Sequence, residues 1–162
     1  MYKTAFALMV TALMAGTVAA SDKSDVMAVI HQWVDGFNKA DTKAMIATCA
    51  DQVAIIDDIP PNEWHGAGAC STWVSAFEDW SAKNAITEGN VAPGKTRHIS
   101  VEGKHAYVVI PMTFSYKDHG KAMKETGAVA TMSLAKGDSG WRISGWSWSS
   151  GMTAAASTDG GH

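Results

Sequence analysis

The chain has 162 residues, a formal net charge of −3 and 46% hydrophobic residues, which fits one globular domain with a proper core. The small, mixed charge leaves no basic footprint for nucleic acid. The sequence contains no Walker loop, dinucleotide fingerprint or His-Glu-x-x-His motif, and its six histidines form no ligand-spaced pair. We therefore expect no nucleic-acid partner, no cofactor and no metal.

The first twenty residues have the pattern of a secretory signal peptide. Lys3 precedes an apolar run that falls short of the ~20 residues needed for a membrane span. Small residues at 18–20 offer a cleavage site, with Ser21 as the mature start. An uncleaved membrane anchor is the alternative, and both interpretations predict export. We expect a periplasmic or secreted protein that is free of the membrane after cleavage.

Residues 151–162 are small, polar and glycine-rich, so we expect a disordered tail and a single domain over 21–150. That domain contains two cysteines, Cys49 and Cys70. In an oxidising compartment an even pair favours a disulfide. Two buried free thiols are an equally weighted alternative, because cysteine is among the most buried residue types.

The first half of the domain is predicted to be mainly helical. Ser24 is a suitable N-cap for a helix whose apolar residues recur at helical spacing as far as Phe37. Asp41 is predicted to cap a short second helix over 42–50. Residues 66–68 open a third helix, and its apolar stripe consists of Cys70, Trp73, Val74, Phe77 and Trp80.

The remaining segments alternate in polarity as strands do. In 51–58 the alternation puts Val53, Ile55 and Asp57 on one face and leaves Asp58 on the other, facing solvent. Four further strands are predicted over 96–102, 105–117, 122–136 and 141–150. Gly127 and Pro111 lie inside long strands and predict bulges or an edge, which help a sheet to curl. Helices covering one face of a curved antiparallel sheet make an α+β fold.

Trp146 and Trp148 are placed by the last predicted strand. Simple alternation puts them on the face opposite Trp141 and Ile143, which is the outer face of the sheet. An exposed aromatic patch there predicts a homodimer interface. A bulge at Gly145 is the alternative, and it would turn both tryptophans inward.

Several motifs together resemble the nuclear-transport-factor-two-like superfamily, which includes ketosteroid isomerases and SnoaL-like cyclases. They are WVDGFNKAD (33–41), CADQVAIIDD (49–58), Gly66 at the start of the third helix, and GWRISGWSWSS (140–150). The resemblance covers roughly residues 25–150. It implies a cone of sheet and helices with an apolar cavity open at one end. It also implies that the helix ends near the two cysteines lie side by side, which would allow a bridge.

In ketosteroid isomerases an aspartate at the end of the first strand is the general base, and the resemblance puts Asp57 at that position. Such a base needs a donor for the oxyanion that forms midway. The family's donor positions correspond here to Trp33 and, approximately, to Ala130, so the oxyanion hole is missing in its known form. His65 and His98 are the candidate assisting groups. The alternative role for Asp57 is a structural cap of the following turn.

The cavity implied by the resemblance suits a flat hydrophobic molecule. Its expected ligand-binding residues are Trp33, Phe37, Trp64, Trp73, Phe77, Met112 and Phe114. We therefore expect an exported binding domain that holds a small hydrophobic molecule. The alternatives are an isomerase, cyclase or dehydratase that uses Asp57 as a base, and a ligand-free dimeric accessory domain.

Overall fold

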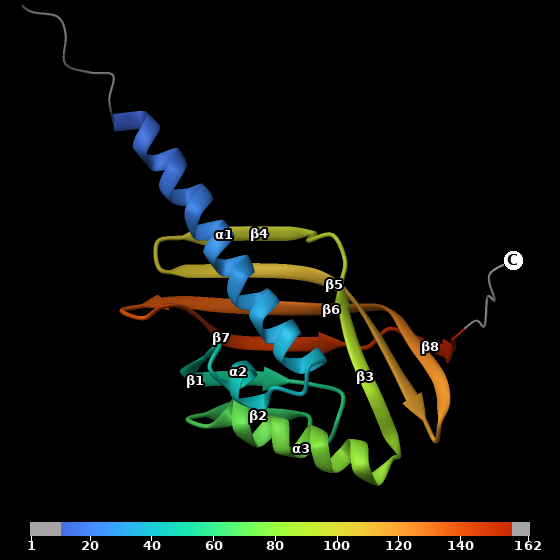
Figure 1. Ribbon diagram of the computed structural model, residues 1–162. Helices are drawn as coiled ribbons and strands as arrows, with labels where there is room; N and C mark the ends of the chain where they lie inside the picture. Colours follow the sequence, from blue (N-terminus) through green and yellow to red (C-terminus); the bar gives the residue numbers. More distant parts are fainter. Residues whose placement is uncertain (1–10, 157–162) are drawn as a thin grey trace, which may run out of the picture.

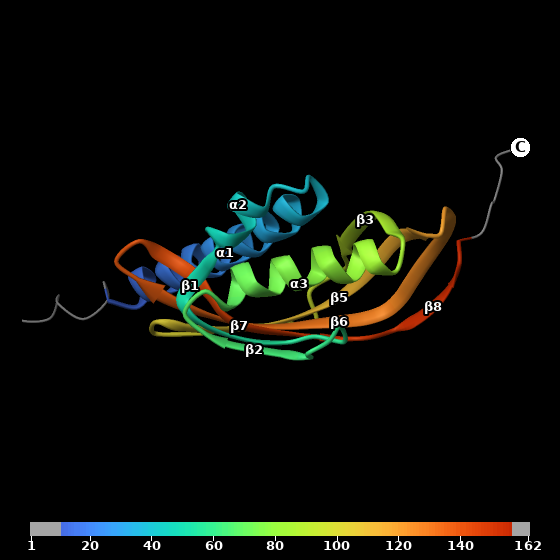
Figure 2. The same cartoon turned by 90° about the horizontal axis from the view of Figure 1, so that it is seen from below.

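The computed structural model describes residues 11–156, in which three helices cover one face of an eight-stranded sheet (Figure 1, Figure 2). The helices are α1 (Thr11–Asn38), α2 (Thr42–Ile46) and α3 (Ala69–Lys83). The strands are β1 (Cys49–Ile56), β2 (Glu63–Gly66), β3 (Ile86–Pro93), β4 (His98–Glu102), β5 (His105–Asp118), β6 (Lys121–Gly137), β7 (Gly140–Ser149) and β8 (Met152–Ala155).

The sheet has the order β2-β1-β7-β6-β5-β3, with β4 paired to β5 and β8 paired to β6. All pairs are antiparallel except β1 with β7, which run parallel. The sheet curves around the helices, and Figure 2 shows its other face without helical cover. The predicted α+β class, with three helices on a curved sheet, is confirmed.

The two longest strands bend where they change partners. Opposite Gly127, whose φ is +80°, the register of β5 and β6 shifts between Met112 and Phe114. On one edge β5 pairs with β4 as far as Val109 and with β3 from Met112 onward. Pro111 lies in the gap between these two pairings, where a residue without an N–H group is tolerated. The predicted irregularities at Gly127 and Pro111 are confirmed, and they curl the sheet as such features do.

The chain bends a further time between β7 and β8, at Gly151, next to the bend in β6 at Gly127. A Cβ on this residue would overlap the carbonyl oxygen of Thr126 and the amide nitrogen of Ala128, so the backbones meet too closely for any side chain. Residues 152–155 then pair with β6, which corrects the start of the predicted tail at residue 151, whereas residues 157–162 of that tail lie outside the described residues. All four side chains of β8 are exposed, so only main-chain hydrogen bonds define this strand and no apolar pattern marks it.

Strands β2 and β3 were also not predicted from the sequence pattern. β2 has four residues, of which only Trp64 is buried. β3 carries a register shift between Thr87 and Asn90, and Glu88 within it has φ +54°. Alternation fails in both cases because the pattern needs an uninterrupted run of residues with one face buried.

The first helix does not start at Ser24, as its predicted N-cap role required, but continues without interruption from Thr11. Residues 11–23 contain no proline and several good helix formers, so the sequence does not end the helix before Ser24. Asp22 fixes this part to the sheet, because its Oδ1 accepts hydrogen bonds from Lys136 Nζ at 2.5 Å and Trp141 Nε1 at 3.3 Å.

The predicted signal peptide falls partly in residues 1–10, outside the described residues, and its cleavage stays a prediction. Within residues 11–156, none of the helices combines the length and apolar character needed to cross a bilayer. The second helix begins as predicted, since Asp41 Oδ1 accepts a hydrogen bond from the backbone N–H of Ala44 at 2.9 Å. It ends early, at Ile46, because Cys49 already pairs with β7.

Trp146 and Trp148 point inward, which corrects their predicted position on the outer face and confirms the alternative of a bulge at Gly145. The register of β6 and β7 shifts between Ser133 and Leu134, which leaves Ser144 as an extra residue next to Gly145. Beyond this bulge the faces of β7 are reversed, so Trp146 is only 5% exposed and Trp148 packs against the core. These tryptophans therefore form no outer patch, and the homodimer stays a prediction without this interface.

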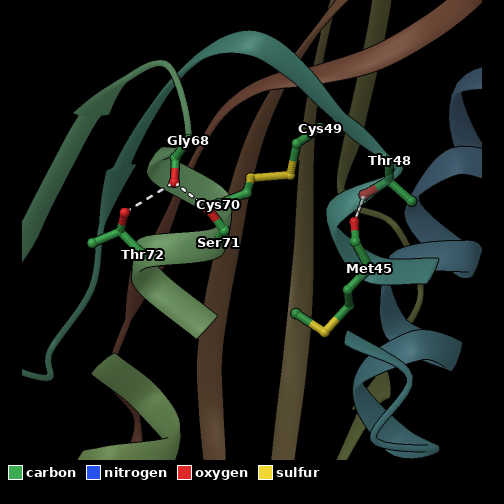
Figure 3. Close-up of a disulfide and its surroundings, with 7 residues drawn as sticks. All are labelled: Met45, Thr48, Cys49, Gly68, Cys70, Ser71 and Thr72. Carbon is green, nitrogen blue, oxygen red and sulfur yellow. Dashed lines mark hydrogen bonds between the residues drawn. A yellow bond between two sulfur atoms is a disulfide. The ribbon is translucent and has the colours of Figure 1, made fainter. Parts of the chain in front are cut away.

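A disulfide joins Cys49, at the start of β1, to Cys70, in the first turn of α3 (Figure 3). Their Cα atoms are 6.6 Å apart. The structure thus decides between the two alternatives for the cysteines in favour of the bridge.

Replacing both cysteines by serine should lower the free energy of unfolding by about 3 kcal/mol, because the bridge restricts the unfolded chain between residues separated by 21 positions. Denaturant unfolding followed by tryptophan fluorescence measures the loss. The reduced wild-type protein is the control and should match the double variant. Two free thiols in denatured, unreduced protein would contradict the bridge.

Candidate functional site

A cavity of about 220 Å³ lies between α1, α3 and the inner face of the sheet. Its aromatic lining consists of Trp33, Phe37, Trp73, Phe77, Trp80, Phe114, Tyr116, Trp146 and Trp148. The other lining residues are Asp57, Asp58, Ile59, Val91, Glu125, Ser150 and Thr153. Side chains from the two helices, from the β1–β2 connection and from five strands thus meet around one space.

The aromatic side chains of the lining support one another. Trp73 meets Trp146 edge to face, with ring centroids 4.8 Å apart and an interplanar angle of 88°. Trp33 contacts both of them, at 6.1 Å and 5.6 Å. Phe114 stacks on Tyr116 at 4.8 Å. Such offset and perpendicular contacts are favourable arrangements of ring quadrupoles, so the wall holds its shape without a ligand.

Asp57 follows β1 directly and extends the inward-facing series of Val53 and Ile55, as predicted. Only 8% of it is exposed. Its Oδ2 accepts a hydrogen bond from Trp73 Nε1 at 2.6 Å, and its Oδ1 accepts one from the backbone N–H of Asp58 at 2.8 Å. The carboxyl group is therefore held between the end of a strand and the middle of α3.

Burial among apolar side chains raises the pKa of Asp57 from its ordinary value of 3.8 to about 7. The hydrogen bonds from Trp73 and from the backbone of Asp58 lower the pKa in part, whereas the neighbouring Asp58 carboxyl group raises it further. A carboxyl group with this pKa populates both its acid and its base form near neutral pH. That property is required of a group that takes up and returns a proton.

Two more acidic side chains reach the cavity, and the sequence pattern gave neither a role there. Asp58 was predicted to face solvent; it is exposed, but it also lines the cavity and its Oδ2 accepts a hydrogen bond from Ser150 Oγ at 2.6 Å. Glu125 is 6% exposed, and its Oε1 accepts a hydrogen bond from the N–H of Gly151 at 2.5 Å. The sequence feature that could have pointed to Glu125 is its position two residues before Gly127, where the bulge turns this part of β6 toward the cavity.

Five of the seven predicted ligand-binding residues line the cavity, and they are Trp33, Phe37, Trp73, Phe77 and Phe114. Trp64 and Met112 do not. Both are buried in the core, at 6% and 2% exposure. The position of Ala130 is a fully buried site in β6, so no donor enters from there.

The two candidate histidines lie away from Asp57, which corrects their assisting role. His65 pairs with Ala54, on the face of the β1–β2 hairpin opposite to Asp57, and it is exposed beside Glu63 at 3.3 Å. His98 is exposed on β4, where its ring lies 5.9 Å from that of Tyr107. Strand alternation explains both positions, because each histidine falls on the solvent face of its strand.

One polar group of the cavity wall has no partner. Among the described residues, Ser81 Oγ and Trp146 Nε1 are the buried side-chain polar atoms without a hydrogen bond. An acceptor on a bound molecule is one way to satisfy the indole N–H of Trp146. Within residues 11–156, no group of three histidine, cysteine, aspartate or glutamate side chains is placed to hold a metal ion.

Asp57→Asn should remove a pH dependence of stability. Because the pKa is higher in the folded chain, Asp57 favours the folded state fully below about pH 4 and loses that effect as the pH rises to about 7. As the pH rises across this window, the free energy of unfolding of the wild type should fall relative to that of the asparagine variant, by at most about 1.4 kcal/mol per pH unit. Urea unfolding at several pH values measures the difference.

The matched control for that experiment is Asp51→Asn, which changes an exposed aspartate of the same strand. It should leave the pH dependence of the wild type intact. Equal pH dependence in the wild type and in Asp57→Asn would show that burial does not perturb Asp57.

Solved structures share the fold at low sequence identity. A nuclear transport factor 2-like superfamily protein from Salmonella enterica serovar Typhimurium is 18% identical, with 88% of this chain and 99% of that chain covered and a TM-score of 0.68. A ketosteroid isomerase-like protein from Erwinia carotovora is 17% identical, with 78% and 94% covered and a TM-score of 0.61. An NTF2-like protein with a cystatin-like fold from Novosphingobium aromaticivorans is 12% identical, with 86% and 88% covered and a TM-score of 0.65.

At these identities the likeness concerns the fold alone. No functionally curated protein matches the chain. The family model of the SnoaL-like domain matches residues 26–154, which include all of the cavity lining and reach into β8. The chain therefore belongs to the SnoaL-like domain family.

Proposed function

We propose that the protein binds a small, largely apolar molecule in the aromatic cavity. The observation that carries the proposal is the lining itself, in which nine aromatic side chains surround one space together with a few polar groups. Ligand sites in proteins commonly have this composition, with apolar walls for affinity and a few placed polar groups for orientation.

The size of the space and the rigidity of its wall support the same proposal. A volume of about 220 Å³ suits a small molecule better than a drug-sized one. The aromatic contacts keep the cavity formed in the absence of a ligand, so little ordering is required on binding. Apolar surface buried against these rings supplies the affinity, at roughly 25 cal/mol per Å² before the costs of association.

Blocking the cavity from β8 tests the proposal. Thr153 lines the cavity yet is exposed, so Thr153→Trp should fill its mouth without disturbing the core. The affinity for 2-naphthol, a flat neutral probe, should fall at least tenfold, measured by quenching of tryptophan fluorescence and by calorimetry.

Met152→Trp is the matched control, because Met152 is the neighbouring residue of β8, is 78% exposed and does not line the cavity. This variant should bind the probe as the wild type does. Equal affinity in the wild type and in Thr153→Trp would place the binding elsewhere and overturn the proposal. If the proposal holds, native mass spectrometry of wild-type protein would identify the physiological ligand among the molecules retained through purification.

A second candidate function is proton transfer between carbons of an enolisable ligand, and the raised pKa of Asp57 favours it. The ionised carboxylate would remove a proton from the carbon next to a carbonyl group and return it to another carbon. The unpartnered N–H of Trp146 is the donor of the wall that would stabilise the oxyanion formed between these steps.

Exchange of the α-protons of 2-tetralone in D₂O, followed by NMR, tests this second function. An enzyme of this kind should accelerate the exchange, with a rate that rises with pH through about 7 and then levels as Asp57 becomes fully ionised. Asp57→Asn should abolish the acceleration while the affinity for 2-tetralone changes little, and Asp51→Asn should behave as the wild type. Binding without accelerated exchange in the wild type would leave a binding protein and exclude the enzyme for this ligand class.

A further inference from the structure

The charges around the cavity indicate what kind of molecule it takes. We propose, on the basis of the binding function above, that the ligand is an organic cation, an amine or quaternary ammonium group carried on a small apolar body. Two independent features of the lining support this inference: carboxyl groups without a counter-ion, and a high content of aromatic side chains.

The carboxyl groups of the lining accept hydrogen bonds from neutral donors. Asp57 accepts from the indole of Trp73, and Asp58 accepts from the hydroxyl group of Ser150. Glu125 accepts from a backbone N–H. The lining includes no lysine, arginine or histidine, and the ion pairs within residues 11–156 involve other acidic residues. Three acidic groups thus face one space with no counter-ion among the described residues.

Burial makes this arrangement costly for the empty protein. Asp57 and Glu125 are 8% and 6% exposed, and an ionised carboxylate loses most of its hydration at such a site. A cation in the cavity would interact with both at low local dielectric and would offset that loss. Asp58 is exposed at the same cavity, where its charge would attract a cation from solution.

The aromatic rings also favour a cationic ligand, through cation–π attraction. The face of an aromatic ring is negative, and a cation over it is attracted, most strongly by tryptophan. Five of the lining residues are tryptophans, namely Trp33, Trp73, Trp80, Trp146 and Trp148. Aromatic cages of this kind recognise quaternary ammonium groups in other proteins. A neutral ligand would use the rings but leave the carboxylates unpaired, and an anion would be repelled by them.

The affinity for such a cation should depend on pH. The titratable groups around Asp57 are Asp58 beside it and Glu125 and Tyr116 on β6 and β5, whereas α1, α3 and β7 contribute aromatic side chains to this space. A quaternary ammonium group keeps its charge at every pH. Its binding should therefore strengthen as Asp57 ionises with rising pH and then level off.

The test compares phenyltrimethylammonium with tert-butylbenzene, its neutral carbon isostere, by fluorescence titration of the full chain at fixed ionic strength. At pH 8 the cation should bind at least tenfold more tightly than the isostere, and this preference should shrink at pH 5. Glu125→Gln keeps the acceptor for Gly151 and removes the charge, so it should reduce the preference for the cation over tert-butylbenzene several-fold.

Glu102→Gln, which changes an exposed residue of β4 outside the cavity, is the matched control and should keep the preference of the wild type. If Glu125→Gln fails to fold, Asp58→Asn serves instead, because Asp58 is exposed and asparagine still accepts from Ser150. Tighter or equal binding of tert-butylbenzene would overturn the cation inference and leave the binding function intact. Failure of both probes and of 2-naphthol to bind would overturn both, and an unchanged preference in both charge variants would also overturn this inference.

Discussion

The bend of β5 and β6 is the feature on which the cone and its cavity depend. It requires the left-handed backbone of Gly127 and the close approach of Gly151 to β6, where no side chain fits. Each long strand changes partners there, from β4 to β3 and from β7 to β8. Without the bend the sheet would lie flatter against the helices, and the residues after the corner, Glu125 and Thr153, would not face α1 and α3.

The second constraint is a carboxyl group enclosed by aromatic rings. Burial removes water from the carboxyl group of Asp57, and two hydrogen bonds, from Trp73 and from the backbone of Asp58, offset part of that loss. The bond to Trp73 also joins the segment after β1 to α3, and the disulfide separately joins the start of β1 to the start of α3. The same burial that costs hydration at Asp57 raises the pKa of its carboxyl group to about 7.

Membership of the SnoaL-like family accounts for the scaffold and leaves the chemistry to individual residues. The acid at the end of β1 is present, but the donor position at Ala130 is apolar and fully buried. Instead an acid stands five positions earlier on β6, at Glu125, and is oriented by Gly151. The cavity therefore combines three acids with tryptophans, an electrostatic pattern that is set by these side chains rather than by the fold.

The sequence by itself determined the elements that show a helical or an alternating apolar pattern, namely the helices, β1, and the strands β4, β5, β6 and β7. It also placed Asp57 on the inward face, because alternation from Val53 and Ile55 continues through the end of the strand. The sequence left two positions open for Trp146 and Trp148, and only the tertiary structure decided between them, because the pairing of β6 with β7 leaves Ser144 as an extra residue that reverses the faces of β7. The same holds for β8 and for Glu125, whose positions follow from main-chain pairing across a bend, an interaction between distant segments that side-chain periodicity does not encode.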